Sequence, residues 1–240
     1  MKVLIIALIV LCGACDGSPG GAAGPTAQEL AIVAEASALP VGSSLVLRAE
    51  LRNAGRSPRP VQARWSVNNA SIATVAQDGT LHGVTLGSVS VTAEYEQLRA
   101  EKAVTVVANV SGTWAGDARI QACGRISGTG TDPCRFLRGE VQALQLAVKQ
   151  PNDRVSGEMI LGAKSGTFEG VLTEDTITVK AALTRGEDQG RFQIPSWMLR
   201  FTGGELVTSG ELRVDEESTN VFGPQRLVLR YSVSPLRRTP

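Results

Sequence analysis

Histidine is nearly absent from this chain, since only one of its 240 residues, His82, is a histidine. A Ser-His-Asp triad, a metal site with two histidines and a histidine proton relay all need histidine within a pocket. His82 follows Asp78-Gly79 on a predicted strand whose apolar residues are Leu81 and Val84. We expect it to face solvent, which excludes the enzyme classes that depend on histidine.

Carboxylate pairs are the remaining candidates for acid–base chemistry, as in glycoside hydrolases. Glu187-Asp188 and Asp215-Glu216-Glu217 lie between predicted strands, where a solvated turn is the simpler interpretation. Asp117, Asp132 and Asp153 lack the alternating spacing of a calcium-binding loop. We therefore expect no catalytic residue, no metal and no cofactor, and we interpret the protein as one that is not an enzyme.

An excess of charge of one sign is also lacking, because 24 Lys and Arg residues stand against 23 Asp and Glu residues. Non-specific binding of nucleic acid requires a cationic field. Peripheral attachment to anionic lipid is helped by a polybasic segment. We therefore expect no nucleic-acid partner, and attachment to a membrane would have to come from another feature.

Long apolar runs are missing beyond the start of the chain, and the first run, Val3 to Leu11, is too short to span a bilayer as a helix. With Lys2 before it and small residues after it, this run has the pattern of a secretory signal peptide. Gly13-Ala14 then precedes Cys15, an order that resembles the lipobox of bacterial lipoproteins. The resemblance implies that residues 1–14 are removed and that the Cys15 thiol carries the lipid.

Cys12 is the alternative lipid acceptor, although the bulky Leu11 directly precedes it. The C-x-x-C spacing of Cys12 and Cys15 would suit redox or zinc chemistry only within a folded motif. Residues 15–28 are rich in Gly, Ala, Pro and Ser and predict a flexible tether that reaches about 20 Å. We expect a protein anchored by lipid in the bacterial cell envelope, on the inner or outer membrane, and either periplasmic or exposed.

Cys123 and Cys134 lie well beyond this segment. Disulfides persist in exported proteins, so we predict that these two cysteines are joined, with two free buried thiols as the alternative. Such a bond closes a short loop and would stabilise the fold by about 2–3 kcal/mol.

Residues 29–107 alternate between apolar and polar positions in short runs that turn residues separate. Such a period of two predicts half-buried strands, and Asp78-Gly79 predicts a hairpin turn because glycine adopts a positive φ easily. Trp65 has the same parity as Ala63 and Val67, so we expect it in the core. The pattern predicts a small antiparallel sandwich.

A series of short motifs marks this segment, in the following order: Leu39-Pro40-Val41-Gly42, Trp65-Ser66 with Asn68, Ile72-Ala73-Thr74-Val75, Asp78-Gly79-Thr80-Leu81, Gly83-Val84, Gly87 to Ala93, and Ala103 to Val106. In their order and over about 80 residues, these motifs resemble the bacterial Ig-like domain of group 2. The resemblance implies an Ig-like sandwich without an antibody-type disulfide, of a kind found in surface adhesins and envelope proteins as spacers or binding modules.

Residues 108–240 predict a second domain, an antiparallel β-meander of about eight strands. Short polar turns separate the alternating runs, and Gly157, Gly170 and Gly210 within them would let the sheet curl. Closure into a barrel is the favoured arrangement, and a sandwich is the alternative. The whole chain is therefore expected to be all-β.

Gly112-Thr113-Trp114 is similar to the G-x-W that opens lipocalin and avidin-type barrels, which implies that Trp114 closes one end. Trp197 follows Pro195-Ser196, where the alternation breaks, which favours a rim or loop-anchoring position over one that lines a barrel mouth. An open lumen lined by Met159, Phe168 and Phe192 would accommodate a ligand, whereas a filled interior would not.

The sequence as a whole predicts a lipid-anchored envelope protein that binds or scaffolds. The membrane, through the lipid on Cys15, is its first expected partner. A second envelope protein, a glycan or a small apolar ligand would bind at the barrel, with Trp197, Phe192, Met159 and Phe168 as the candidate surface. A purely structural protein with a filled barrel is the alternative, and a carboxylate-dependent hydrolase is the third hypothesis.

Overall fold

A computed structural model describes residues 28–128, 131–186, 190–220 and 223–240. The predicted leader, Cys12, Cys15 and the tether as far as Ala27 lie outside these residues, as do Glu187 and Asp188. Within the described part of the chain, no helix has both the length and the apolar character needed to cross a membrane. The fold is all-β, as predicted, and has two separate sets of sheets.

The N-terminal unit, residues 28–107, forms three small sheets with the strand orders β1-β4-β5, β2-β10-β9-β6 and β3-β8-β7. All of its strand pairs are antiparallel except β2 with β10. Its strands are β1 (Gln28–Val33), β2 (Ala38–Pro40), β3 (Ser44–Val46), β4 (Arg48–Asn53), β5 (Arg59–Val61), β6 (Arg64–Val67), β7 (Ala73–Val75), β8 (Thr80–Gly83), β9 (Gly87–Tyr95) and β10 (Leu98–Val107).

The core of this unit lies between its sheets and includes Trp65, which is buried as predicted. The predicted hairpin at Asp78-Gly79 joins β7 to β8, and Gly79 has a φ of 87°. A side chain at Gly79 would also collide with the backbone carbonyl of Leu47. Glycine is therefore required here both for its backbone conformation and for space.

The C-terminal unit is a closed barrel. Its ring of eight strands runs β11-β12-β13-β14-β15-β16-β18-β19 and returns to β11. The short strands β17 and β20 pair with each other and complete the wall between β16 and β11. The strands are β11 (Gly112–Gly128), β12 (Val141–Lys149), β13 (Arg154–Leu161), β14 (Lys164–Thr173), β15 (Thr176–Thr184), β16 (Arg191–Thr202), β17 (Glu205–Thr208), β18 (Leu212–Asn220), β19 (Gly223–Val233) and β20 (Leu236–Arg238).

The break in alternation at Pro195-Ser196 is a β-bulge rather than the end of a strand. Strand β16 continues through it, while the register against β15 shifts between the pairs Val179–Trp197 and Ala181–Ile194. A bulge inserts a residue and changes which side of the sheet the following side chains face. Trp197 is therefore directed into the barrel and is 2% exposed, which differs from the rim position that the sequence favoured.

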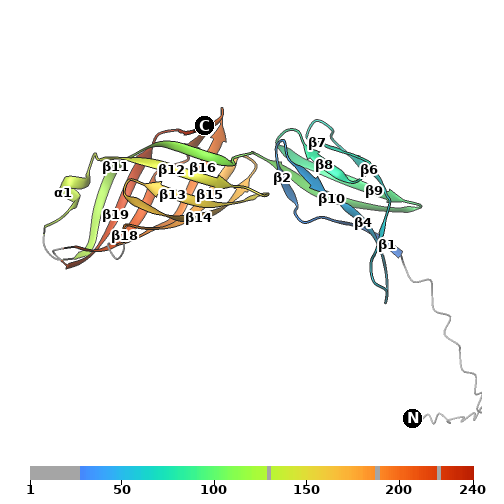
Figure 1. Ribbon diagram of the computed structural model, residues 1–240, viewed down its shortest axis with the longest axis horizontal. Coiled ribbons are helices and arrows are strands. Elements are labelled where there is room, and N and C mark those ends of the chain that lie inside the picture. Colours follow the sequence, from blue (N-terminus) through green and yellow to red (C-terminus); the bar gives the residue numbers. More distant parts are fainter. Residues whose placement is uncertain (1–27, 129–130, 187–189, 221–222) are drawn as a thin grey trace, which may run out of the picture.

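One short helix, α1 (Cys134–Leu137), lies between β11 and β12 and departs from the all-β pattern expected from the sequence. A disulfide joins Cys123 on β11 to Cys134, the first residue of α1, as predicted. The two Cα atoms are 5.2 Å apart and both cysteines are buried. The disulfide therefore holds α1 against the end of the barrel that is remote from the N-terminal unit (Figure 1).

The two units lie end to end, and β1 begins at the end of the N-terminal unit away from the barrel (Figure 1). The connection between them is hydrogen-bonded to the barrel. The Gln150 side chain accepts from the Val110 N–H at 2.7 Å and donates to the Ala108 carbonyl at 2.8 Å. The Ala108 N–H also donates to the Glu174 carbonyl at 2.8 Å, so the junction is held by specific contacts on the barrel side.

Candidate functional site

The barrel end that faces the N-terminal unit is closed by Trp114, in the place that the G-x-W resemblance implies. Trp114 is fully buried, and its indole N–H donates to the Val110 carbonyl at 2.8 Å. Phe201 lies edge-on to the ring at 5.9 Å, and the Arg238 guanidinium lies 4.9 Å from its centre. Every polar group of this indole is satisfied, as a buried tryptophan requires.

The opposite end of the barrel is polar inside. In a strand, every second side chain faces the interior, and four of the inward positions nearest this end hold polar residues in place of apolar ones. They are Gln142 on β12, Lys164 on β14, Glu216 on β18 and Gln225 on β19. These four residues are called the mouth cluster below.

Lys164 is the most deeply buried member of the mouth cluster, with 1% of its surface exposed. Its ammonium donates to the Gln142 side-chain carbonyl at 2.9 Å and lies 5.2 Å from the centre of the Phe192 ring. Loss of hydration lowers the pKa of Lys164 to about 8, and the positive charge of Arg185 adds to this effect, while Glu216 and Glu140 oppose it. Lys164 therefore loses its proton more readily than an exposed lysine does.

Glu216 is the carboxylate of the cluster and is 8% exposed. It accepts a hydrogen bond from the Ser218 hydroxyl at 2.9 Å, and the Gln225 amide donates to that same hydroxyl at 3.3 Å. Among the described residues, neither Glu216 nor Lys164 forms an ion pair. The cluster thus holds a buried cation and a buried carboxylate that do not neutralise each other directly.

A cavity of about 130 Å³ lies within this cluster. Its other lining residues are Arg185 and five apolar side chains, of which Ile120, Leu227 and Leu229 come from the barrel wall and Pro133 and Leu137 come from the α1 segment. Tyr231 lies close by, and its hydroxyl donates to the Gln142 carbonyl at 3.4 Å. Burial raises the pKa of the Tyr231 phenol, so it stays protonated as a donor.

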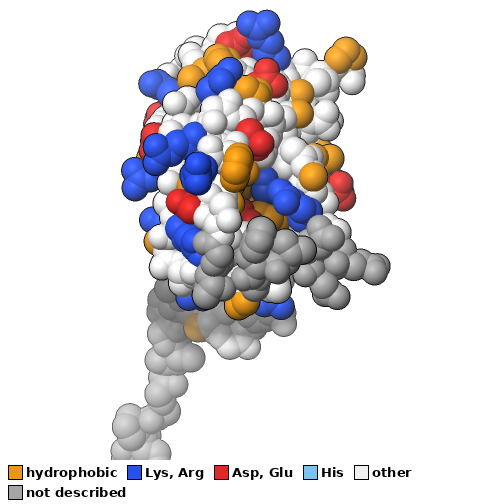
Figure 2. All heavy atoms as spheres, turned by 90° about the vertical axis from the view of Figure 1, so that its left-hand side faces the viewer, with side chains coloured by type: hydrophobic (Ala, Val, Ile, Leu, Met, Phe, Trp, Pro, Cys, Tyr) orange, Lys and Arg blue, Asp and Glu red, His pale blue; other side chains and the backbone are white. Residues whose placement is uncertain are grey.

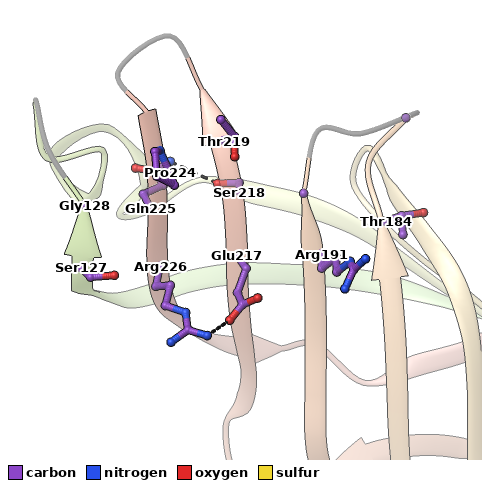
Figure 3. Close-up of a pocket in the computed structure, with 12 residues that line it drawn as sticks. Ser127, Gly128, Thr184, Arg191, Glu217, Ser218, Thr219, Pro224, Gln225 and Arg226 are labelled. Carbon is purple, nitrogen blue, oxygen red and sulfur yellow. Dashed lines mark hydrogen bonds and ion pairs between the residues drawn. The ribbon is translucent and has the colours of Figure 1, made fainter.

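A wider hollow of about 1030 Å³ lies outside this cavity, between the ends of β11, β15, β16, β18 and β19 (Figure 3). Gln225 lines both the hollow and the cavity, so the two spaces are adjacent. Glu217 and Arg226 form an ion pair across the wall of the hollow, and Arg191 projects away from them (Figure 3). Basic, acidic and hydrophobic side chains are interspersed on this end of the molecule (Figure 2).

The residues predicted to line a ligand-binding lumen lie in the packed core instead. Met159, Phe168 and Phe192 are 0–4% exposed, and Trp197 donates its indole N–H to the Thr208 hydroxyl at 3.0 Å. The cavity and the hollow at the mouth are lined by other residues. The interior of an eight-stranded barrel is just wide enough for side chains to fill it, and large residues from most strands fill this one.

The mouth cluster is not evident from the sequence, because two of its members stand in polar segments typical of turns. Residues 163–166 and 215–217 each predict a polar turn, whereas Lys164 and Glu216 both lie in strands. The alternation of inward and outward positions along each strand could have identified both residues as inward-facing. Lys164 alternates in phase with Phe168 and Leu172, and Glu216 does so with Leu212 and Val214.

The described residues contain no group of three or more His, Cys, Asp and Glu side chains placed to hold a metal ion. His82 is exposed on β8, and its Nδ1 lies 3.3 Å from the Ser44 hydroxyl. The mouth cluster has instead the chemistry of a small polar binding site, with one charge of each sign and two amides, and Arg185 and apolar side chains line the same cavity.

Comparison with known proteins agrees with the N-terminal architecture. Residues 27–107 match the family described as bacterial Ig-like domain (group 2). These bounds agree with the domain predicted from the sequence landmarks. No curated protein matches the chain.

Proposed function

We propose that the chain is a lipid-anchored protein of the bacterial cell envelope, in which the Ig-like unit is a spacer and the barrel is the binding domain. The order of parts along the molecule carries this proposal. In the sequence, the lipobox-like segment at Cys15 and the tether precede the Ig-like unit. In the structure, β1 begins at the end of the Ig-like unit away from the barrel, and the polar mouth lies at the barrel end remote from that unit (Figure 1).

The junction between the units supports the spacer role. The Asn109 amide donates to the Val41 carbonyl of the N-terminal unit at 3.4 Å, and Arg238 of the barrel donates to the Asn109 carbonyl at 3.0 Å. Ala38 of β2 packs in the same buried cluster as the barrel core. Contacts from both sides of the connection would keep the barrel extended from the Ig-like unit and its mouth directed away from the membrane.

Metabolic labelling tests the anchoring. Cells that express the full chain are fed a palmitate analogue, and label is expected on the wild type and on Cys12→Ala but not on Cys15→Ala. Cys12→Ala is the matched control, because it removes a thiol from the same segment. Label retained by Cys15→Ala, or no label on the wild type, would overturn the proposed anchor.

A purely structural role in envelope assembly is the second candidate. The packing of Met159, Phe168 and Phe192 in the barrel core favours it over a carrier of bulky apolar ligands. In this alternative the mouth cluster holds water alone, and a binding measurement at the mouth distinguishes the two roles.

A further inference from the structure

Among the described residues, the two buried charges of the mouth cluster have no ionic partner. An ammonium has three donors, yet within this part of the chain Lys164 makes one hydrogen bond, to Gln142, and faces the Phe192 ring. Over the same residues Glu216 makes one hydrogen bond, with Ser218, although a carboxylate accepts several. Burying an ion is costly unless charge pairs and hydrogen bonds replace its hydration. Both groups therefore have unused bonding capacity beside the same cavity.

The arrangement of charge around the cavity limits what it would bind. Lys164 and Glu216 project into it from β14 and β18. Arg185 also lines the cavity, so two cationic side chains and one carboxylate surround it. Glu140 does not line the cavity and acts on Lys164 less strongly than Arg185 or Glu216. An anion would be repelled by Glu216, and a cation by Lys164 and Arg185. A neutral molecule with separated positive and negative groups suits both ends.

The size of the cavity limits the ligand further. Its volume of about 130 Å³ equals that of about four water molecules in the liquid. This space admits a compact molecule and excludes a peptide or a sugar ring with several substituents. Gln225 lies between the cavity and the outer hollow, which marks the route by which a small molecule would enter.

We propose that the mouth cluster binds a small zwitterion, an amino acid with a side chain no larger than that of serine. Its carboxylate would face Lys164 and Arg185, and its ammonium would face Glu216. The proposal rests on the binding role assigned to the barrel, and it names the chemical class of ligand for that role.

Calorimetric titration of the purified full chain at neutral pH tests this assignment. Glycine, alanine and serine are the probes, and acetate, methylammonium and their equimolar mixture are the comparison ligands. At least one amino acid is expected to bind saturably, and about tenfold or more tightly than either single ion, because only a zwitterion pairs with both buried charges. Equal binding of acetate or of the mixture would overturn the proposal, as would the absence of saturable binding by all three amino acids at millimolar concentration.

Variants assign the binding to the cluster. Lys164→Met and Glu216→Gln are each expected to weaken amino-acid binding by about tenfold or more. Lys180→Met and Glu158→Gln alter exposed charges on β15 and β13 and are expected to leave binding unchanged. Unchanged binding in both cluster variants would overturn the site. If a cluster variant does not fold, the comparison of glycine with the acetate–methylammonium mixture on the wild type still decides the result.

Failure of this test is distinguishable from failure of the anchor. A chain that carries label on Cys15 but binds no zwitterion would be the structural envelope protein of the second candidate. A chain that binds glycine but carries no label would keep the mouth site and lose the proposed location.

Discussion

The two ends of the barrel are closed by opposite chemistry. At the end beside the Ig-like unit, Trp114 fills the interior, its one donor is satisfied by Val110, and Phe201 packs against it. At the far end, Lys164 and Glu216 occupy inward positions beside a cavity, and neither has an ionic partner among the described residues.

This difference separates a stabilising end from a functional one. Apolar burial with satisfied hydrogen bonds stabilises a fold, whereas buried charges without partners destabilise it. Violations of the local rules of folding are expected at functional sites, where another requirement outweighs stability. The end at the unit junction thus has the properties of a structural closure, and the end beneath α1 has those of a binding site.

The largest expected loss of stability comes from a substitution of Trp114, at the barrel end beside the Ig-like unit. Trp114→Ala is expected to lower the free energy of unfolding by about 3–5 kcal/mol, because it leaves a cavity in a fully buried position. Denaturant titration followed by circular dichroism measures the change. Trp114→Phe is the control and should cost less, since it keeps most of the ring. A loss below about 1 kcal/mol for Trp114→Ala would contradict the closing role.

Loss of the Cys123–Cys134 disulfide, at the mouth end of the barrel, is expected to have the second-largest effect on stability. Replacing both Cys123 and Cys134 with Ala is expected to lower the free energy of unfolding by about 2–3 kcal/mol, because a cross-link over this short loop restricts the unfolded chain. Thermal unfolding with and without reductant checks this, and the reduced wild type should approach the double variant. Identical unfolding of the oxidised wild type and the variant would show that the bond does not stabilise the barrel.

The smallest effect concerns Lys164 and depends on pH. Lys164→Met is expected to raise the free energy of unfolding by about 1–2 kcal/mol near neutral pH, since it removes an unpaired buried charge. The pKa of Lys164 is lowered from 10.5 to about 8 in the folded state, so between these values the unfolded chain holds the proton more often. Wild-type stability should therefore rise with pH across this window and the advantage of the variant should shrink.

Denaturant titrations at several pH values between neutrality and pH 10.5 measure this difference, with Lys180→Met as the exposed control. A constant difference between the wild type and Lys164→Met across the window would contradict the burial of the charged ammonium.

Much of the fold could be predicted because it depends on local pattern. The alternation of Ile177, Val179, Ala181 and Leu183 marks β15, and the structure buries these four residues and exposes those between them. Asp78-Gly79 marks the hairpin of β7 and β8. A period of two and a residue with positive φ are properties of neighbouring residues, so no tertiary information is needed to recognise them.

Three other features of the barrel could not be predicted from local pattern. The bulge at Pro195-Ser196 interrupts the alternation, so the sequence favours a rim position for Trp197, whereas the structure places it in the core. The single turn of α1 is too short to show a helical period. Polar residues at strand ends resemble turn residues in composition, and this resemblance hid Lys164 and Glu216.

The sequence by itself determined the all-β class, the Ig-like unit, the meander and the pairing of Cys123 with Cys134, because each depends on local spacing, on recognisable motifs or on the cysteines available. Tertiary structure alone decided that the barrel end beside the Ig-like unit is filled by apolar side chains and that the opposite end is polar inside. Closure of the ring directs β14 and β18 onto one barrel interior, and so brings Lys164 and Glu216 to one cavity although 51 residues lie between them in the sequence. Parity shows that each side chain faces inward, but only the closed barrel shows what it faces.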